Sequence, residues 1–140
     1  MLKTLMSRML LMWGLVFCWI GYSWIAAPTA SRLAGISWVP IPLNEQVVGT
    51  AWLLAGIFAL VGAFVRRSLP PLAIVPAFIP LLVALIFLGS YVDSWDVNRL
   101  VSMVSYAGMG LSIVIVGSTP GSYVDTRWYD LGDTEKSSGA

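Results

Sequence analysis

Residues 46–65 read QVVGTAWLLAGIFALVGAFV, a run of twenty residues without Asp, Glu, Lys or Arg. Three further runs without charge occupy residues 9–31, 68–92 and 100–124, so all 8 basic and 7 acidic side chains lie between or beyond the runs. A helix rises about 1.5 Å per residue, and about 20 apolar residues cross the roughly 30 Å hydrocarbon core of a bilayer. The sequence therefore predicts an all-α integral membrane protein with four transmembrane helices.

The chain divides into a membrane domain, residues 1–117, and a polar tail, residues 118–140. The tail is rich in charge, contains Gly and Pro, and is expected to be partly disordered. The four helices are expected to pack as an up-down antiparallel bundle. Their expected ranges are about 9–27, 46–65, 71–92 and 99–117.

The composition supports lipid as the surrounding medium. The residues AVILMFWYC make up 58% of the chain and charged residues 11%, against about 25% charged in soluble domains. A soluble chain of this size could not cover that much apolar surface. The net charge of +1 leaves no basic surface for nucleic acid. Cys18 is the only cysteine, so no intrachain disulfide can form.

The distribution of basic residues predicts the orientation. After four crossings, six basic residues share one side of the membrane and two lie on the other, which places both termini in the cytoplasm by the positive-inside rule. The expected location is the plasma (inner) membrane. The inner group is Lys3, Arg8, Arg66, Arg67, Arg127 and Lys136, and the outer group is Arg32 and Arg99.

An alternative interpretation makes the first apolar run a signal peptide. Lys3 and Arg8 precede it, and a cut after Ala27 would leave three spans and an external N-terminus. The run is longer than a usual signal core, and Pro28 would follow the cut, so we retain four spans as the main prediction.

The second span carries a face of small residues, which lets helix backbones approach closely in a membrane. The partner of this face could be another span of the chain or a second copy. The predicted packing residues are Gly49, Ala55, Gly56, Ala59, Gly62 and Ala63. In the first span, Gly14 and Gly21 are expected to face helices, while Trp13, Phe17 and Trp24 are expected to face lipid.

Two polar or irregular features lie within the later spans. Pro76 and Pro80 predict a kink in the third span, or a hydrated cavity beside it, because each proline removes a helical hydrogen bond. In the fourth span, small polar residues predict a packing stripe or the lining of a pore. This stripe consists of Ser102, Ser105, Gly108 and Ser112.

The outer connections carry aromatic and capping residues. Residues 36–43 contain Trp38 and two prolines, which predicts an extended strip on the outer leaflet, with docking of a partner as the alternative. Asn44 is expected to cap the second span. An outer-rim polar cluster contains Asp93, Asp96 and Arg99, with Asp96 expected to cap the fourth span; a cation or proton site is the alternative for this cluster.

No catalytic, cofactor or metal signature is recognisable. The chain has no His and no glycine-rich phosphate loop, and no span contains a carboxylate. We therefore expect neither an enzyme nor a cofactor, metal or small-molecule site. The favoured hypothesis is a holin-like lysis protein that self-associates and permeabilises the membrane. Two alternatives are an accessory or assembly subunit of a larger membrane complex, and a membrane-resident immunity or exclusion protein.

Overall fold

The computed structural model describes residues 5–64 and 74–119, and every regular element within them is helical. The inner basic residues Arg66 and Arg67 and the expected polar tail, except for its first two residues, lie outside this part of the chain. The elements are α1 (Leu5–Ala26), α2 (Ala30–Ile36), α3 (Glu45–Phe64), the 3-10 turn η1 (Val75–Ala77), α5 (Phe78–Ser94) and α6 (Val97–Ser118).

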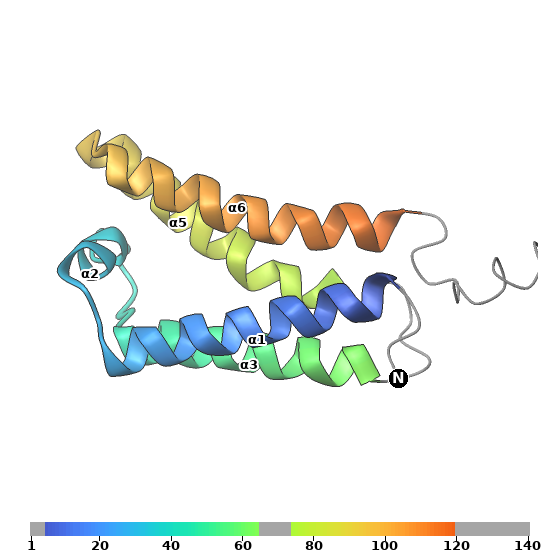
Figure 1. Cartoon of the computed structure of the whole chain (residues 1–140). Helices are drawn as coiled ribbons and strands as arrows, with labels where there is room; N and C mark the ends of the chain where they lie inside the picture. The colour runs from blue at the N-terminus through green and yellow to red at the C-terminus, as the bar shows by residue number, and fades with distance from the viewer. Residues whose placement is uncertain (1–4, 65–73, 120–140) are drawn as a thin grey trace, which may run out of the picture.

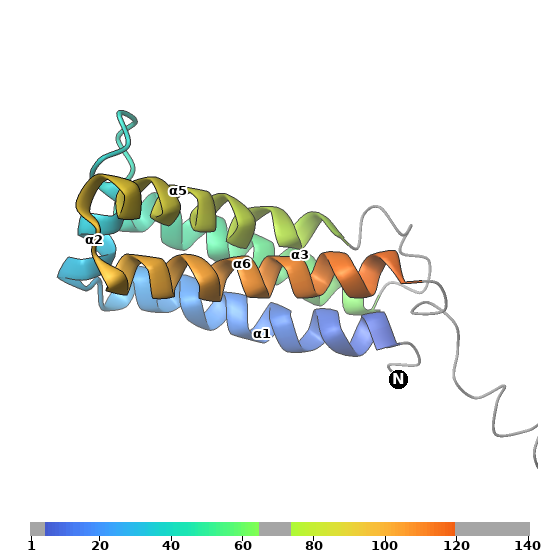
Figure 2. The same cartoon turned by 90° about the horizontal axis from the view of Figure 1, so that it is seen from above.

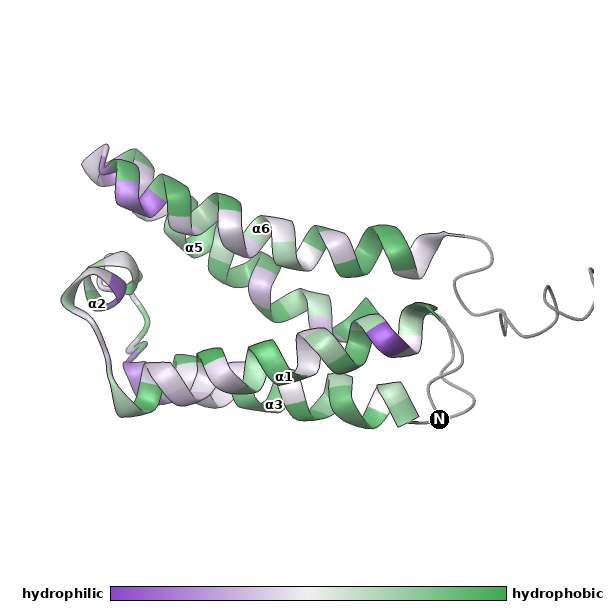
Figure 3. Ribbon diagram, in the orientation of Figure 1, coloured by the Kyte–Doolittle hydropathy of each residue, from purple (hydrophilic) through white to green (hydrophobic). Residues whose placement is uncertain are grey.

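Four of these helical segments are long and apolar enough to cross a membrane, counting η1 and α5 as one segment. The prediction of an all-helical chain with four such helices is confirmed. Large apolar side chains point outward on all of them, including Trp19, Phe78 and Ile115, whose exposed fractions are 70%, 65% and 63%. Figure 3 shows the strongest hydrophilic colouring near the helix ends. Apolar surface of this extent needs lipid or another protein to cover it.

The long helices form two pairs. The most extensive contacts are those between α1 and α3 and those between α5 and α6. Figure 1 shows each pair as an antiparallel hairpin, and Figure 2 shows the α5–α6 pair overlying the α1–α3 pair. The pairs lie close together where α1 begins and α6 ends, and they diverge toward α2 (Figure 1). The second and third spans also touch, but each has its main partner within its own pair.

The outer connection between α1 and α3 contains a helix that the sequence analysis did not predict. Residues 30–36 form α2, which ends before the two prolines at positions 40 and 42. Residues 37–44 contain turns and bends without regular structure. Trp38 is 44% exposed, and one side of its ring packs against Gly89 of α5. This contact is specific to the tertiary fold and leaves no pattern in the local sequence.

Side-chain caps start α3 and α6, as predicted. Asn44 Oδ1 accepts a hydrogen bond of 2.9 Å from the backbone N–H of Val47. Asp96 Oδ1 accepts one of 2.9 Å from the backbone N–H of Asn98. Each bond satisfies a donor that the first turn of a helix would otherwise leave free.

Candidate functional site

The α1–α3 interface is built on glycines in direct backbone contact. A Cβ on Gly56 would lie 2.7 Å from the Cys18 backbone nitrogen and 2.9 Å from the Gly14 carbonyl oxygen. A Cβ on Gly21 would lie 2.7 Å from the carbonyl oxygen of Gly49. Real Cβ atoms essentially never come this close to backbone atoms, so only glycine fits at these positions.

These glycines also set the register of the pair. Gly14 lies opposite Gly56 and Gly21 opposite Gly49, so each helix repeats its contact after two helical turns. Five of the six predicted packing residues of α3 are buried and the sixth, Gly62, is half-buried against Leu10. The complete set is Gly49, Ala55, Gly56, Ala59, Gly62 and Ala63. Within the chain, α1 contacts the three glycines of this face, and Ala55 also borders the groove beside η1 and α5.

A ring-to-ring path connects the two helix pairs. The ring centroids of Phe17 and Trp52 lie 5.1 Å apart, those of Trp52 and Tyr106 lie 5.5 Å apart, and those of Tyr106 and Phe87 lie 5.5 Å apart. We call these four residues the aromatic seam. Its central contact, Trp52 to Tyr106, crosses from α3 to α6. Such spacings are favourable for aromatic pairs.

The prediction that Trp13, Phe17 and Trp24 face lipid is wrong. Phe17 and Trp24 are fully buried and Trp13 is half-buried, whereas Trp19 and Tyr22 are the exposed rings of α1. The reason is that α1 has two neighbours. Its glycines contact α3, and its ring-bearing arc lies between the two helix pairs, a second contact that helical periodicity alone does not reveal.

Three tryptophans have buried indole N–H groups without a hydrogen-bond acceptor. Among the described residues, Nε1 of Trp13, Trp24 and Trp52 is buried and has no hydrogen-bond partner. The Trp24 indole lies near the Tyr106 hydroxyl but outside hydrogen-bonding geometry. A buried donor without a partner carries a free-energy cost.

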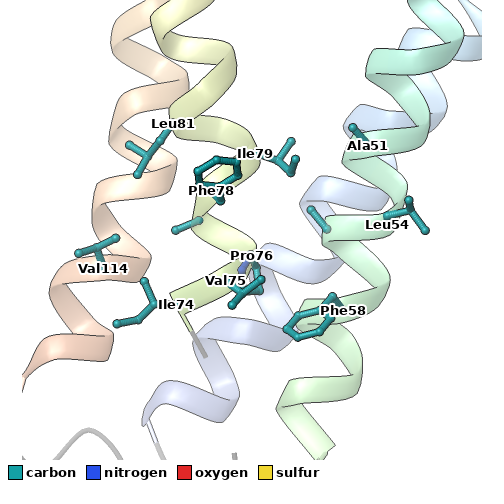
Figure 4. Close-up of a pocket in the computed structure, with 12 residues that line it drawn as sticks. Ala51, Leu54, Phe58, Ile74, Val75, Pro76, Phe78, Ile79, Leu81 and Val114 are labelled. Carbon is teal, nitrogen blue, oxygen red and sulfur yellow. The ribbon is translucent and has the colours of Figure 1, made fainter. Parts of the chain in front are cut away.

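An apolar groove of about 610 Å³ separates α3 from η1 and the start of α5 (Figure 4). Leu54, Ala55 and Phe58 line one wall, and Val75, Pro76 and Phe78 line part of the other. None of the lining side chains is titratable. The groove can therefore hold hydrocarbon, but it has no group for acid, base or metal chemistry.

The two prolines of the third span lie in its first described turns, after Ile74, which is itself helical. Pro76 is in η1, and Pro80 is the third residue of α5; both are buried. Pro80 has no N–H to donate to the carbonyl oxygen of Pro76, four residues earlier, so the helical hydrogen-bond pattern is interrupted at this level. At the prolines the α-helical pattern gives way to the 3-10 turn η1 before α5 begins, and the kink within the third span stays a prediction.

The serine stripe of α6 lies on the outside of the molecule. Ser105 and Gly108 are exposed, and Ser102 and Ser112 are half-buried. A Cβ on Gly108 would meet nothing within 4 Å. The three hydroxyls donate to carbonyl oxygens of their own helix over 2.8 to 3.0 Å, which leaves their oxygen lone pairs available as acceptors. The face of α6 that packs internally is a different one, with Tyr106, Gly110, Ile113 and Gly117 buried.

The outer-rim cluster is organised around a buried serine that the sequence analysis missed. Arg99 Nη1 donates to the carbonyl oxygen and to Oγ of Ser90, at 3.1 and 2.5 Å, and Ser90 is fully buried. Arg99 Nε also lies 3.7 Å from an Asp96 carboxylate oxygen, while Asp93 is exposed. Among the described residues, no group of three His, Cys, Asp or Glu side chains could hold a metal.

Comparison with protein-family models, with curated proteins and with solved structures gives no match to this chain.

Proposed function

We infer that this chain is a multi-pass protein of the plasma membrane whose termini both face the cytoplasm. The distribution of charge supports this orientation. Arg8 lies in the first turns of α1, at the end where α6 also finishes, and Arg32 and Arg99 lie toward the opposite end. The excess of basic residues in the whole chain falls on the Arg8 side, which is the cytoplasmic side by the positive-inside rule.

Within the membrane, the protein is proposed to act as a holin-like lysis protein that self-associates and opens the bilayer. The observation that carries this proposal is the serine stripe on α6. Small residues let helices approach closely, and hydroxyl oxygens can accept hydrogen bonds from water or from a neighbouring helix. Gly108 and Ser105 of this stripe are exposed on the single chain, whereas the glycines of the α3 face already contact α1.

In such an assembly, copies would first pack through Gly108 and its neighbours. Stripes from several copies could then surround a common centre and present a row of hydroxyl oxygens to water. Among the described residues, the interface between the pairs consists mainly of aromatic and apolar side chains, so a single chain does not supply a comparable row of hydroxyl groups. Permeabilisation would therefore depend on the number of copies in the membrane.

Induced expression of the full chain tests this proposal. We expect abrupt growth arrest with leakage of small solutes, and chemical crosslinking should yield a ladder of homo-oligomers. Gly108→Leu should reduce both effects at equal expression, because it blocks close approach on the stripe. Thr50→Leu, a similar change at an exposed position of α3, should leave both unchanged.

Other outcomes would favour the alternative functions. Harmless accumulation of monomer would rule out the holin-like role. Purification in mild detergent with one stoichiometric foreign partner would indicate an accessory or assembly subunit. Survival of expressing cells under a challenge that kills control cells would indicate an immunity or exclusion protein.

A further inference from the structure

The outer connection of the α1–α3 pair contacts α5 at the end of the molecule where the two pairs diverge (Figure 1). Trp38 Nε1 donates a hydrogen bond of 3.0 Å to the carbonyl oxygen of Ile86. The Trp38 ring lies so close to Gly89 that a Cβ there would overlap it. Gly35 of α2, three residues before Trp38, packs against the ring of Phe87 in α5. We call these contacts the outer latch.

On its other side, α2 is attached to α1. Arg32 Nη1 donates a hydrogen bond of 3.0 Å to Ser23 Oγ, and the guanidinium lies 5.4 Å from the centre of the Trp24 ring. A cation in this position is attracted to the indole face. The outer connection is therefore held to its own helix pair by Arg32, and the outer latch is its contact with the other pair.

The outer latch can be released without leaving a buried polar group unpaired. Trp38 is 44% exposed, so its indole N–H can reach water or lipid headgroups once it leaves α5. The Ile86 carbonyl lies within a regular helix, where it can keep the hydrogen bond from the N–H four residues later. A contact of this kind contributes little net free energy and can form and break repeatedly.

The interface between the two helix pairs, next to the outer latch, contains both favourable ring contacts and unpaired hydrogen-bond donors. The Trp52–Tyr106 ring contact joins the two pairs, but the buried Trp24 and Trp52 N–H groups have no partner there. Water entering between the pairs would satisfy those groups. At the opposite end the pairs stay close, since Met6 Cε lies 3.5 Å from the Cβ position of Gly117.

We propose that the outer latch is a conformational switch. When Trp38 leaves α5, the α5–α6 pair swings away from the α1–α3 pair about the inner-end contacts, and the aromatic seam becomes wet. When Trp38 binds, the seam is closed and dry. This inference holds whether or not copies of the chain assemble into a pore.

Distance measurements between spin labels test the switch in the full chain, reconstituted in liposomes with Cys18→Ala as background. Gln46→Cys and Asn98→Cys place labels at exposed positions near the outer ends of α3 and α6, one in each pair. With Trp38 intact we expect one dominant short distance. Trp38→Ala should raise the ratio of long to short distances about tenfold, as expected for loss of one hydrogen bond and its ring packing.

Three further variants separate release of the latch from general damage. Gly89→Ala displaces the Trp38 ring from the α5 side and should give the same shift as Trp38→Ala, and it should add no further shift when combined with Trp38→Ala. Trp38→Phe keeps a ring without the N–H and should give a smaller shift. Trp19→Ala, which removes an exposed ring, should give none.

A second label pair, Gln46→Cys with Tyr22→Cys, reports the distance within the α1–α3 pair and should not change in any latch variant. An unchanged distance between α3 and α6 in both Trp38→Ala and Gly89→Ala would overturn the proposal. Equal broadening of the distance within the α1–α3 pair would also overturn it, because the variants would then have loosened the whole fold.

Discussion

The α1–α3 interface and the interface between the two helix pairs are held in different ways. In the first, glycines bring backbone atoms of two helices into contact at two levels. In the second, side chains form the contact: the aromatic seam, the outer latch and, on one side, a groove of about 610 Å³. The glycine contacts and the aromatic seam lie within helices long and apolar enough for a membrane, whereas Trp38 and Gly35 of the outer latch lie in the outer connection.

This difference explains which motions the protein can make. Two backbones in contact leave no room for adjustment, because any sliding brings a side chain against a main chain. Rings and an indole hydrogen bond can separate and re-form without breaking a helix. We therefore expect each pair to behave as a stable unit and the junction between pairs to be the movable part.

The largest effect should come from filling the glycine contact. Gly56→Leu would force a branched side chain against the Cys18 and Gly14 backbones, and we expect a loss of about 3 kcal/mol in the free energy of unfolding. Unfolding in mixed micelles, followed by circular dichroism, measures this loss. Gly108→Leu is the matched control, because its Cβ position is empty. Equal losses from both variants would show that the glycine contact does not hold the pair.

A smaller effect should follow from opening the aromatic seam. Trp52→Ala removes ring contacts with Phe17 and Tyr106, and we expect a loss of about 2 kcal/mol. This loss is smaller than the usual cost of replacing a buried Trp by Ala in a soluble protein. In lipid there is no hydrophobic driving force for the helices to associate, and the substitution also removes one unpaired N–H group. The same micelle titration applies. A loss greater than that of Gly56→Leu would reverse the ranking of the two interfaces.

The outer rim offers a test within the α5–α6 pair. Arg99→Ala leaves the buried Ser90 hydroxyl without its charged partner, and we expect a loss of about 1.5 kcal/mol. Asp93→Asn, at an exposed position of the same cluster, should change the unfolding free energy by less than the error of the titration. If the two variants behave alike, Ser90 is not the centre of the cluster.

The smallest effects should come from the two helix caps, one in each pair. Asn44→Ala and Asp96→Ala each remove one side-chain acceptor of a first-turn N–H, at a cost of about 1 kcal/mol. Asp96→Asn keeps an acceptor and should restore most of the stability. Equal free energies of unfolding for Asp96→Asn and Asp96→Ala would indicate that the Asp96 carboxylate stabilises α6 through its charge and not through the hydrogen bond.

The sequence predicts the tight interface better than the movable one. Charge-free runs define the four long helices because the bilayer sets their length, and the small residues of α3 mark a packing face because few other features bring helices together in lipid. Glycines seven residues apart in α1 and α3 also carry the register, although their match becomes evident only once the helices are paired.

The junction between the pairs is harder to predict because aromatic residues suit both lipid and protein. Nothing local distinguishes Phe17, which is buried, from Trp19, which is exposed. The Trp38–Gly89 contact joins residues far apart in the chain, and Ser90 becomes a polar centre only when Arg99 folds over it. These features depend on which helices are neighbours.

Site-directed labelling tests the membrane arrangement most directly. In the Cys18→Ala background, single cysteines at Thr29, Asn98, Ser7 and Thr119 mark the two ends of the helical bundle, and intact cells are treated with a membrane-impermeant maleimide. We expect Thr29→Cys and Asn98→Cys to be labelled at once, and Ser7→Cys and Thr119→Cys only after the membrane is permeabilised. Labelling of Ser7→Cys and Thr119→Cys from opposite sides would contradict four crossings.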